Sequence, residues 1–208
     1  MAYWKLLSTA DSIGGLNLTN AGDLAFADGP VSSEGQVTFN GADVLTHGAN
    51  PILYNFGSVD WFANCWIKAN AVPMGNESVN ISGPDFVGWY IGVKADGLNV
   101  AAYGATEDGH SNFLVGGLAA GIFHNIQMWR LKNNMMFFSV DGSNPVSVDD
   151  GPIPTNVTTN TVYLGGQYGG SANCTDTLAS LGIWKGTIPD EGQRAYLVAA
   201  TPESTFTR

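Results

Sequence analysis

Acidic side chains are the first candidates for chemistry in this sequence, which contains 18 Asp and Glu. Glycosidases built on β-sandwiches use two carboxylates at alternate positions of one strand, because side chains two residues apart share a face. No Asp or Glu pair here has that spacing, and the close acidic pairs are direct neighbours, Glu107-Asp108, Asp149-Asp150 and Asp190-Glu191. Neighbours on a strand point to opposite faces. The sequence argues against such a hydrolase and leaves an acid pair from separate segments as the alternative.

The three histidines give no stronger indication of catalysis. His47, His110 and His124 fall in three different segments, and the patterns Gly-x-Ser-x-Gly and His-Glu-x-x-His are absent. We expect His47 and His110 to be solvated loop residues and His124 to pack near a sheet edge. The sequence therefore predicts a protein that is not an enzyme.

Calcium is the one cofactor that the sequence leaves open. The run Asp108-Gly-His-Ser-Asn112 places polar side chains at alternate positions of a glycine-containing loop, as oxygen-rich cation loops do. Asp108 and Asn112 are therefore the candidate ligands. A plain polar turn is the favoured alternative, because loops are commonly polar.

Aromatic side chains flanked by amides suit the binding of a sugar, because a pyranose has apolar faces and a rim of hydroxyls. The alternative is that most of the six Trp fill the core, which we expect of Trp66 and Trp184. The candidate ligand-binding residues are Trp89, Tyr90, Tyr103, His110, Asn112, Trp129 and Tyr168.

Charge and composition exclude several classes of partner. The formal net charge is −10 with only 8 Lys and Arg, so no basic surface is expected for nucleic acid or anionic membranes. No apolar run approaches the roughly 20 residues of a membrane-spanning helix. The N-terminus lacks the pattern of a secretory signal, so we expect synthesis in the cytoplasm without a signal peptide. We expect free thiols at Cys65 and Cys174, with Cys65 in the core.

Turn residues divide the chain into short strands. Asp-Gly begins at Asp28, Asp96, Asp108, Asp141 and Asp150, and such dipeptides adopt the positive φ angles of hairpin turns. Between the turns lie segments of strand composition at 36–40, 51–56, 61–69, 86–94, 98–103, 112–118, 122–131, 135–140, 161–165 and 178–184. Strands at this spacing predict an all-β, two-sheet antiparallel β-sandwich or a barrel, formed by one domain over residues 1–208.

Three local patterns are specific enough to test. Asp96-Gly97 predicts a hairpin between 89–94 and 98–103, and Asn133-Asn134 predicts one between 127–131 and 135–140. In the run 126–131 neither alternating face is cleanly polar, which indicates a strand covered on both sides or a concave sheet with outer aromatics. The segment 187–198 predicts one short C-terminal helix, with Pro189 in its first turn and acidic residues at its N-terminus.

Several segments, in this order, resemble the laminin-G-like (LamG) branch of the concanavalin A-like jelly rolls. The opening strands are represented by Tyr3-Trp4-Lys5-Leu6 and by 15–19. Matching inner strands are Ala63-Asn64-Cys65-Trp66-Ile67-Lys68, Phe123-His124-Asn125-Ile126-Gln127-Met128 and 135–142. The closing strands are Val162-Tyr163-Leu164-Gly165-Gly166 and Ala179-Ser180-Leu181-Gly182-Ile183-Trp184, followed by the acidic helix. Ser180 or Leu181 replaces an acidic residue that is frequent in the family, which weakens an inherited calcium site.

This resemblance implies a concanavalin A-like jelly roll and a lectin-like, noncatalytic binding or adhesion domain. A chain that starts at Met1 and holds one such domain is similar to bacteriophage structural proteins, so we expect a virion component such as a capsid decoration, head fibre or tail protein. Its expected partners are host-surface carbohydrate or a neighbouring virion protein, and a homo-oligomer is left open. The alternatives are a purely structural subunit-contact protein of a virion and, less favoured, a glycoside-active enzyme.

Overall fold

The computed structural model describes residues 1–10, 12, 15–29, 34–48, 59–69, 76–82, 88–94, 97–103, 110–115, 119–132, 135–149, 161–166 and 174–199. For 76–82, 88–90, 93–94, 97–103, 110–115 and 148–149 the description is of the backbone.

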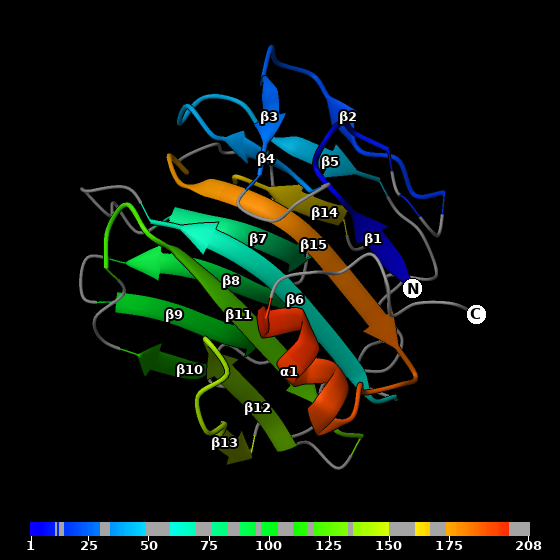
Figure 1. The fold of residues 1–208 in the computed structure, drawn as a ribbon, viewed down its shortest axis with the longest axis vertical. Coiled ribbons are helices and arrows are strands. Elements are labelled where there is room, and N and C mark those ends of the chain that lie inside the picture. Colours follow the sequence, from blue (N-terminus) through cyan, green and yellow to red (C-terminus); the bar gives the residue numbers. More distant parts are fainter. Residues whose placement is uncertain are drawn as a thin grey trace.

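The described residues form two antiparallel sheets and one helix (Figure 1). Sheet A runs in the order β13 (Val146–Asp149), β12 (Met135–Val140), β11 (Phe123–Arg130), β6 (Trp61–Lys68), β15 (Thr177–Lys185), β4 (Gly35–Thr38) and β3 (Phe26–Asp28), with β1 (Ala2–Trp4) beside β15. Sheet B runs in the order β10 (His110–Val115), β9 (Gly97–Tyr103), β8 (Gly88–Lys94), β7 (Asn76–Ser82), β14 (Thr161–Leu164), β5 (Leu45–His47) and β2 (Thr19–Asn20). The predicted two-sheet sandwich is confirmed.

The main core lies between the two sheets and follows from period-two alternation. On β11, Ile126 and Met128 are fully buried in it, and on sheet B so are Ile91, Val162 and Leu164. Residues at i and i+2 share a face, so these positions fix which side of every neighbouring strand faces inward.

The C-terminal helix α1 (Glu191–Ala199) lies across the face of sheet A that is turned away from sheet B (Figure 1). A second apolar cluster lies on this face, beneath the helix. It consists of Tyr3, Phe62, Trp129, Trp184 and Leu197, with Phe137 and Ile188 packed against it. Strand β11 is therefore covered on both sides, the first of the two alternatives that its mixed sequence left open. In globular proteins an apolar sheet face exposed to water is unfavourable, and α1 removes this face from water.

Both predicted hairpins are present. Strand β8 pairs with β9, with Lys94 opposite Gly97, and β11 pairs with β12, with Arg130 opposite Met136. The predicted helix is also confirmed, although its first turn begins after Pro189. The strand predicted at 51–56 lies outside the described residues.

Strand β7 (Asn76–Ser82) was not predicted, because Asn, Ser and Glu fill most of it. Its apolar positions Val79 and Ile81 pair with Ile91 and Trp89 of β8. Two apolar residues at alternate positions are a weak signal in isolation, and the pairing with a neighbouring strand supplies the rest.

Cys65 and Cys174 form no disulfide bond with each other, and both are fully buried in the main core. Burial raises the pKa of the Cys65 thiol, because desolvation disfavours the thiolate. We expect neither thiol to react with a disulfide reagent in the native protein at neutral pH, and both to react in urea. A thiol count of zero in urea would show a disulfide instead.

Gly182 on β15 provides a test of the second cluster. A Cβ at this position would overlap the ring of Trp184 and crowd Tyr3. We expect Gly182→Ala to lower the free energy of unfolding by about 1–3 kcal/mol, the usual cost of overpacking. Urea denaturation measures it.

Gly48→Ala is the matched control, because its Cβ would meet no atom within 4 Å. We expect a change within about 0.5 kcal/mol for this variant. Equal effects of the two substitutions would contradict the packing described for Gly182.

Candidate functional site

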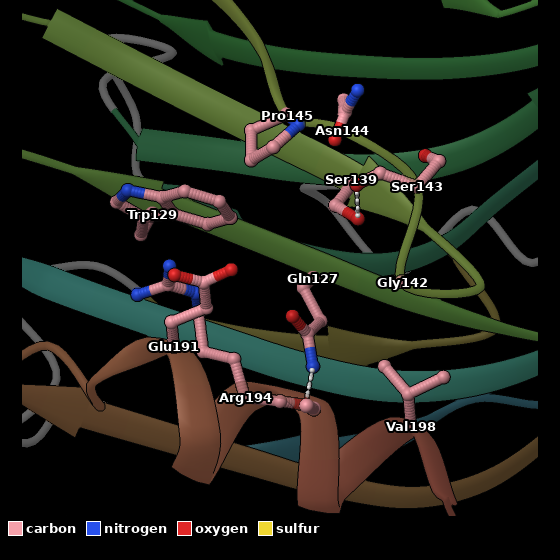
Figure 2. A pocket seen from close by; sticks show the side chains of 11 residues that line it. Gln127, Trp129, Ser139, Gly142, Ser143, Asn144, Pro145, Glu191, Arg194 and Val198 are labelled. Carbon is pink, nitrogen blue, oxygen red and sulfur yellow. Dashed lines mark hydrogen bonds between the residues drawn. The ribbon is translucent and has the colours of Figure 1, made fainter.

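A hollow lies on the outer side of sheet A, between α1 and the turn that joins β12 to β13 (Figure 2). Its volume is about 130 Å³. The floor comes from β11 and β12, and the two walls come from the turn and the helix. It is lined by Gln127, Trp129, Ser139, Gly142, Ser143, Asn144, Pro145, Glu191, Arg194, Ala195 and Val198.

Trp129 on the floor belongs to a row of four aromatic residues across sheet A. Strand register places Phe137, Trp129, Phe62 and Trp184 side by side on β12, β11, β6 and β15. Ring centroids are 5.3 Å apart for Phe137 and Trp129, 6.2 Å for Trp129 and Phe62, and 5.3 Å for Phe62 and Trp184. Such cross-strand pairs add about 0.5–1.5 kcal/mol each beyond burial. The floor of the hollow is therefore rigid.

Arg194 joins the helix to this row. The carbon at the centre of its guanidinium lies 4.7 Å from the centroid of the Trp129 ring, a cation–π contact. Its Nη1 donates to the carbonyl of Pro189 at 2.7 Å. Below it the helix starts with a capping box, in which Asp190 Oδ1 accepts from the Gln193 N–H and Gln193 Oε1 accepts from the Asp190 N–H. These contacts hold the Arg194 side chain over the floor.

Two buried amides of β11 hold the helix backbone. Gln127, 2% exposed, donates from Nε2 to the carbonyl of Arg194 at 2.8 Å. Asn125, which is fully buried, donates from Nδ2 to the carbonyl of Leu197 at 3.5 Å. The Leu197 carbonyl is in the last helical turn, where carbonyls lack an intrahelical partner, so Asn125 supplies a donor there.

The other wall depends on a tight turn. Asp141 and Gly142 have φ angles of 51° and 72°, and the Ser143 N–H donates to the Val140 carbonyl at 2.9 Å, the geometry of a type I′ turn. Asp141 Oδ1 accepts from the Asn125 N–H at 2.8 Å, and Oδ2 lies 2.7 Å from His124 Nδ1. The side chain of Asp141 therefore ties this turn to the start of β11.

The chemistry of the hollow is that of a mixed polar and apolar binding site. Trp129, Pro145, Ala195 and Val198 supply apolar surface, while Gln127, Ser143, Asn144, Glu191 and Arg194 supply hydrogen-bonding groups. Among the described residues no group of three or more His, Cys, Asp or Glu could hold a metal ion.

Sheet B carries most of the other predicted site residues. Pairing places Asn112, Ala101, Tyr90 and Asn80 opposite one another on β10, β9, β8 and β7, and the row continues through Tyr163, Thr46 and Thr19 on β14, β5 and β2. His110, Tyr103 and Gly88 form the neighbouring row.

The register assigns these two rows to the outer side of sheet B. Ile91 on β8 is buried in the main core, so its alternating set faces inward. Both rows belong to the other alternating set of their strands, which faces away from the core. Tyr90, Tyr103, His110 and Asn112 thus share one side of three adjacent strands. Trp89 occupies the same alternating set as Ile91.

The remaining predicted residues are distributed elsewhere. Trp129 lies on sheet A and is 6% exposed. Tyr168 and Asp108 lie outside the described residues, so the calcium pair Asp108 and Asn112 remains a prediction.

The histidine predictions need correction. His47 ends β5, where its Nδ1 donates to the Asn17 carbonyl at 2.8 Å, and His110 begins β10, so neither is a loop residue. His124 is on β11, an interior strand of sheet A, rather than at an edge. Each histidine stands alone in its segment, so no local pattern indicated its place on a strand. That place is set by strand pairing.

Sequence reasoning missed the residues of the helix and turn that line the hollow, chiefly Asn144, Glu191 and Arg194. Gln127 could have been singled out, since an amide beside Trp129 on a strand covered on both sides must find a buried partner. Its partner, a helix carbonyl, could not be read from spacing.

Comparison with solved structures shows the same fold in other proteins. Domain 4 of AbnA, a GH43 extracellular arabinanase from Geobacillus stearothermophilus in complex with arabinotriose, matches with a TM-score of 0.71 at 14% identity, over 95% of this chain and 97% of that one. The binding domain of Paraclostridial Mosquitocidal Protein 1 matches with a TM-score of 0.71 at 14% identity, over 91% and 48%.

The binding domain of botulinum neurotoxin DC in complex with rat synaptotagmin II matches with a TM-score of 0.69 at 14% identity. The match covers 93% of this chain and 50% of that one, so the chain spans about half the length of these toxin domains. No family model and no curated protein matches the sequence. These likenesses establish the fold.

The nine-residue helix α1 is the longest in the described part, and no helix there is long and apolar enough to cross a membrane.

Asp141 allows a test of the wall of the hollow. We expect Asp141→Ala to lower the free energy of unfolding by about 1–3 kcal/mol. The backbone N–H of Asn125 loses its acceptor, and His124 loses a charged partner. Urea denaturation measures the change. Asp28→Ala, at an exposed position of β3, is the control and should change stability little. Equal stability of the two variants would contradict the role of Asp141.

Proposed function

We propose that this chain is a noncatalytic, lectin-like binding domain whose ligand is a carbohydrate, and that the ligand lies on the outer side of sheet B at the β8–β10 end. The observation that carries this proposal is the register of β8, β9 and β10. It brings Tyr90, Tyr103, His110 and Asn112 to the same side of three adjacent strands.

The composition of the row through Tyr90 supports a neutral, hydroxylated ligand. This row crosses all seven strands of sheet B and has no formal charge: apart from Ala101, its members Asn112, Tyr90, Asn80, Tyr163, Thr46 and Thr19 have amide, phenol or hydroxyl groups. Tyr163 at the middle of the row is 9% exposed. The ligand is therefore assigned to the β8–β10 end.

Contrast with sheet A supports the choice of face. The outer side of sheet A is covered by α1 and its aromatic cluster. In the described part of the chain no helix packs on sheet B.

The structural neighbours support binding rather than catalysis. The arabinanase domain was solved with arabinotriose, and a toxin binding domain of the same fold was solved with rat synaptotagmin II. A protein partner is the second candidate on that ground. A laminin-G-like relationship and a place on a bacteriophage virion remain predictions from the sequence, as does bound calcium.

A glycan array probed with the whole chain, with and without calcium, tests the proposal. We expect enrichment on a class of neutral glycans, and titration of the strongest hit should give a Kd that rises about tenfold or more in Tyr90→Ala and Tyr103→Ala, a loss of about 1.4 kcal/mol. Each Tyr supplies flat apolar area for a sugar face.

Thr46→Ala on β5 is the control, because Thr46 belongs to the same row but lies three strands away from β8. It should bind as the unmodified chain does. No enrichment on any glycan would overturn the carbohydrate assignment in favour of a protein ligand. Enrichment that both Tyr variants retain would move the site off this face, and release of reducing ends from a bound polysaccharide would show an enzyme.

A further inference from the structure

The hollow on sheet A has features of a binding site that the assignment to sheet B does not explain. Its floor is buried, with Gln127, Trp129 and Ser139 at 2%, 6% and 4% exposure. Its rim is exposed at 142–145 on the turn and at Glu191 and Ala195 on the helix. We propose that this hollow is a second, independent ligand site that takes one neutral sugar ring, such as the terminal residue of a glycan.

The size of the hollow limits the ligand to a single ring. Its volume is about 130 Å³. An apolar protein cavity of about 150 Å³ accommodates one benzene molecule. A pentose or hexose ring that leaves some hydroxyls at the exposed rim fits this size, whereas two linked rings do not.

The lining matches the two surfaces of a sugar. Pro145 on the turn and Val198 on the helix present apolar groups to the space (Figure 2), and Ala195 on the helix also lines it. On the floor, Phe137 stacks with Trp129 and the Arg194 guanidinium lies over the Trp129 ring, so Trp129 supports the hollow from below. The apolar surface of the turn and helix residues suits the C–H face of a sugar ring.

Hydrogen-bonding groups lie around that apolar surface. Gln127 uses its amide nitrogen on the Arg194 carbonyl (Figure 2), and its amide oxygen can act only as an acceptor. Ser143 Oγ accepts from the Val140 N–H at 3.3 Å, which leaves its own hydrogen to donate. Asn144 adds an exposed amide. The hollow therefore offers both acceptors and donors to the hydroxyls of a ligand.

The charges favour a neutral ligand. Glu191 and Arg194 both line the hollow, so its formal charge is zero. An anionic sugar would approach the Glu191 carboxylate, and a cationic amine would approach the Arg194 guanidinium. A neutral glycoside avoids both repulsions and can hydrogen-bond to either group.

The walls are formed before any ligand arrives. Asp141 fixes the turn through two hydrogen-bonding contacts to β11, and Gln127 together with Arg194 fixes the helix. A site that needs no ordering loses little conformational entropy on binding.

Titration of the whole, uniformly ¹⁵N-labelled chain with methyl glycosides of neutral pentoses and hexoses tests the site. The readouts are the NMR shifts of the Trp129 indole N–H and the Gln127 side-chain amide. We expect saturable shifts with at least one glycoside. The Kd should be about a millimolar, because a single ring makes few contacts.

A pair of variants on α1 separates this site from others. Ala195→Trp places a large side chain in the hollow and should raise the Kd by about tenfold or more. Ala199→Trp puts the same side chain at an exposed helix position that does not line the hollow, so its Kd should match that of the unmodified chain. Both replacements are on the solvent side of α1, which preserves the fold.

Two results would overturn the proposal: no saturable shift with any neutral glycoside, or equal binding by Ala195→Trp and the unmodified chain. Preferential binding of methyl glucuronide or methyl glucosaminide would contradict the assignment of a neutral ligand. Tyr90→Ala should leave these shifts unchanged. Failure of the site on sheet B and failure of this site are therefore distinguishable.

Discussion

The structure depends on the burial of both faces of the central strands of sheet A. On β11, Ile126 and Met128 enter the core between the sheets, while Gln127 and Trp129 are buried beneath α1. Without the helix, the row of Phe137, Trp129, Phe62 and Trp184 would face water on one side of the sheet. The helix also satisfies the polar members of that face, since its carbonyls accept from Gln127 and Asn125.

The hollow is a consequence of this arrangement. A nine-residue helix covers part of the sheet face, and the turn after β12 rises beside it without filling the space between them. The type I′ turn is fixed by Asp141, and the helix is fixed by Arg194 on Trp129. Two rigid walls on a rigid floor thus leave room for a ligand at little conformational cost. The outer side of sheet B differs, because strand pairing alone aligns its aromatic and amide residues into rows.

Local patterns predicted much of the fold and only part of the candidate sites. Asp96-Gly97 and Asn133-Asn134 predicted the hairpins β8–β9 and β11–β12, because few residues tolerate the positive φ angles of hairpin turns. Asp141-Gly142 likewise marked a turn, while the run 126–131 left open a strand covered on both sides or a sheet with outer aromatics. Strand β7 escaped because its two apolar positions are separated by polar residues. Tyr90, Tyr103, His110 and Asn112 were selected one by one for their chemistry, and nothing in their spacing showed that they occupy one side of three adjacent strands.

The sequence alone determined an all-β sandwich with a short closing helix, because turn chemistry, alternation and capping act over a few residues. Tertiary structure decided which residues meet. Trp129 contacts Arg194 across 65 positions of sequence, and Tyr90 reaches the row of Tyr163 and Thr46 only through β7 and β14. Register and helix docking come from the packing of the whole chain, which no local pattern encodes.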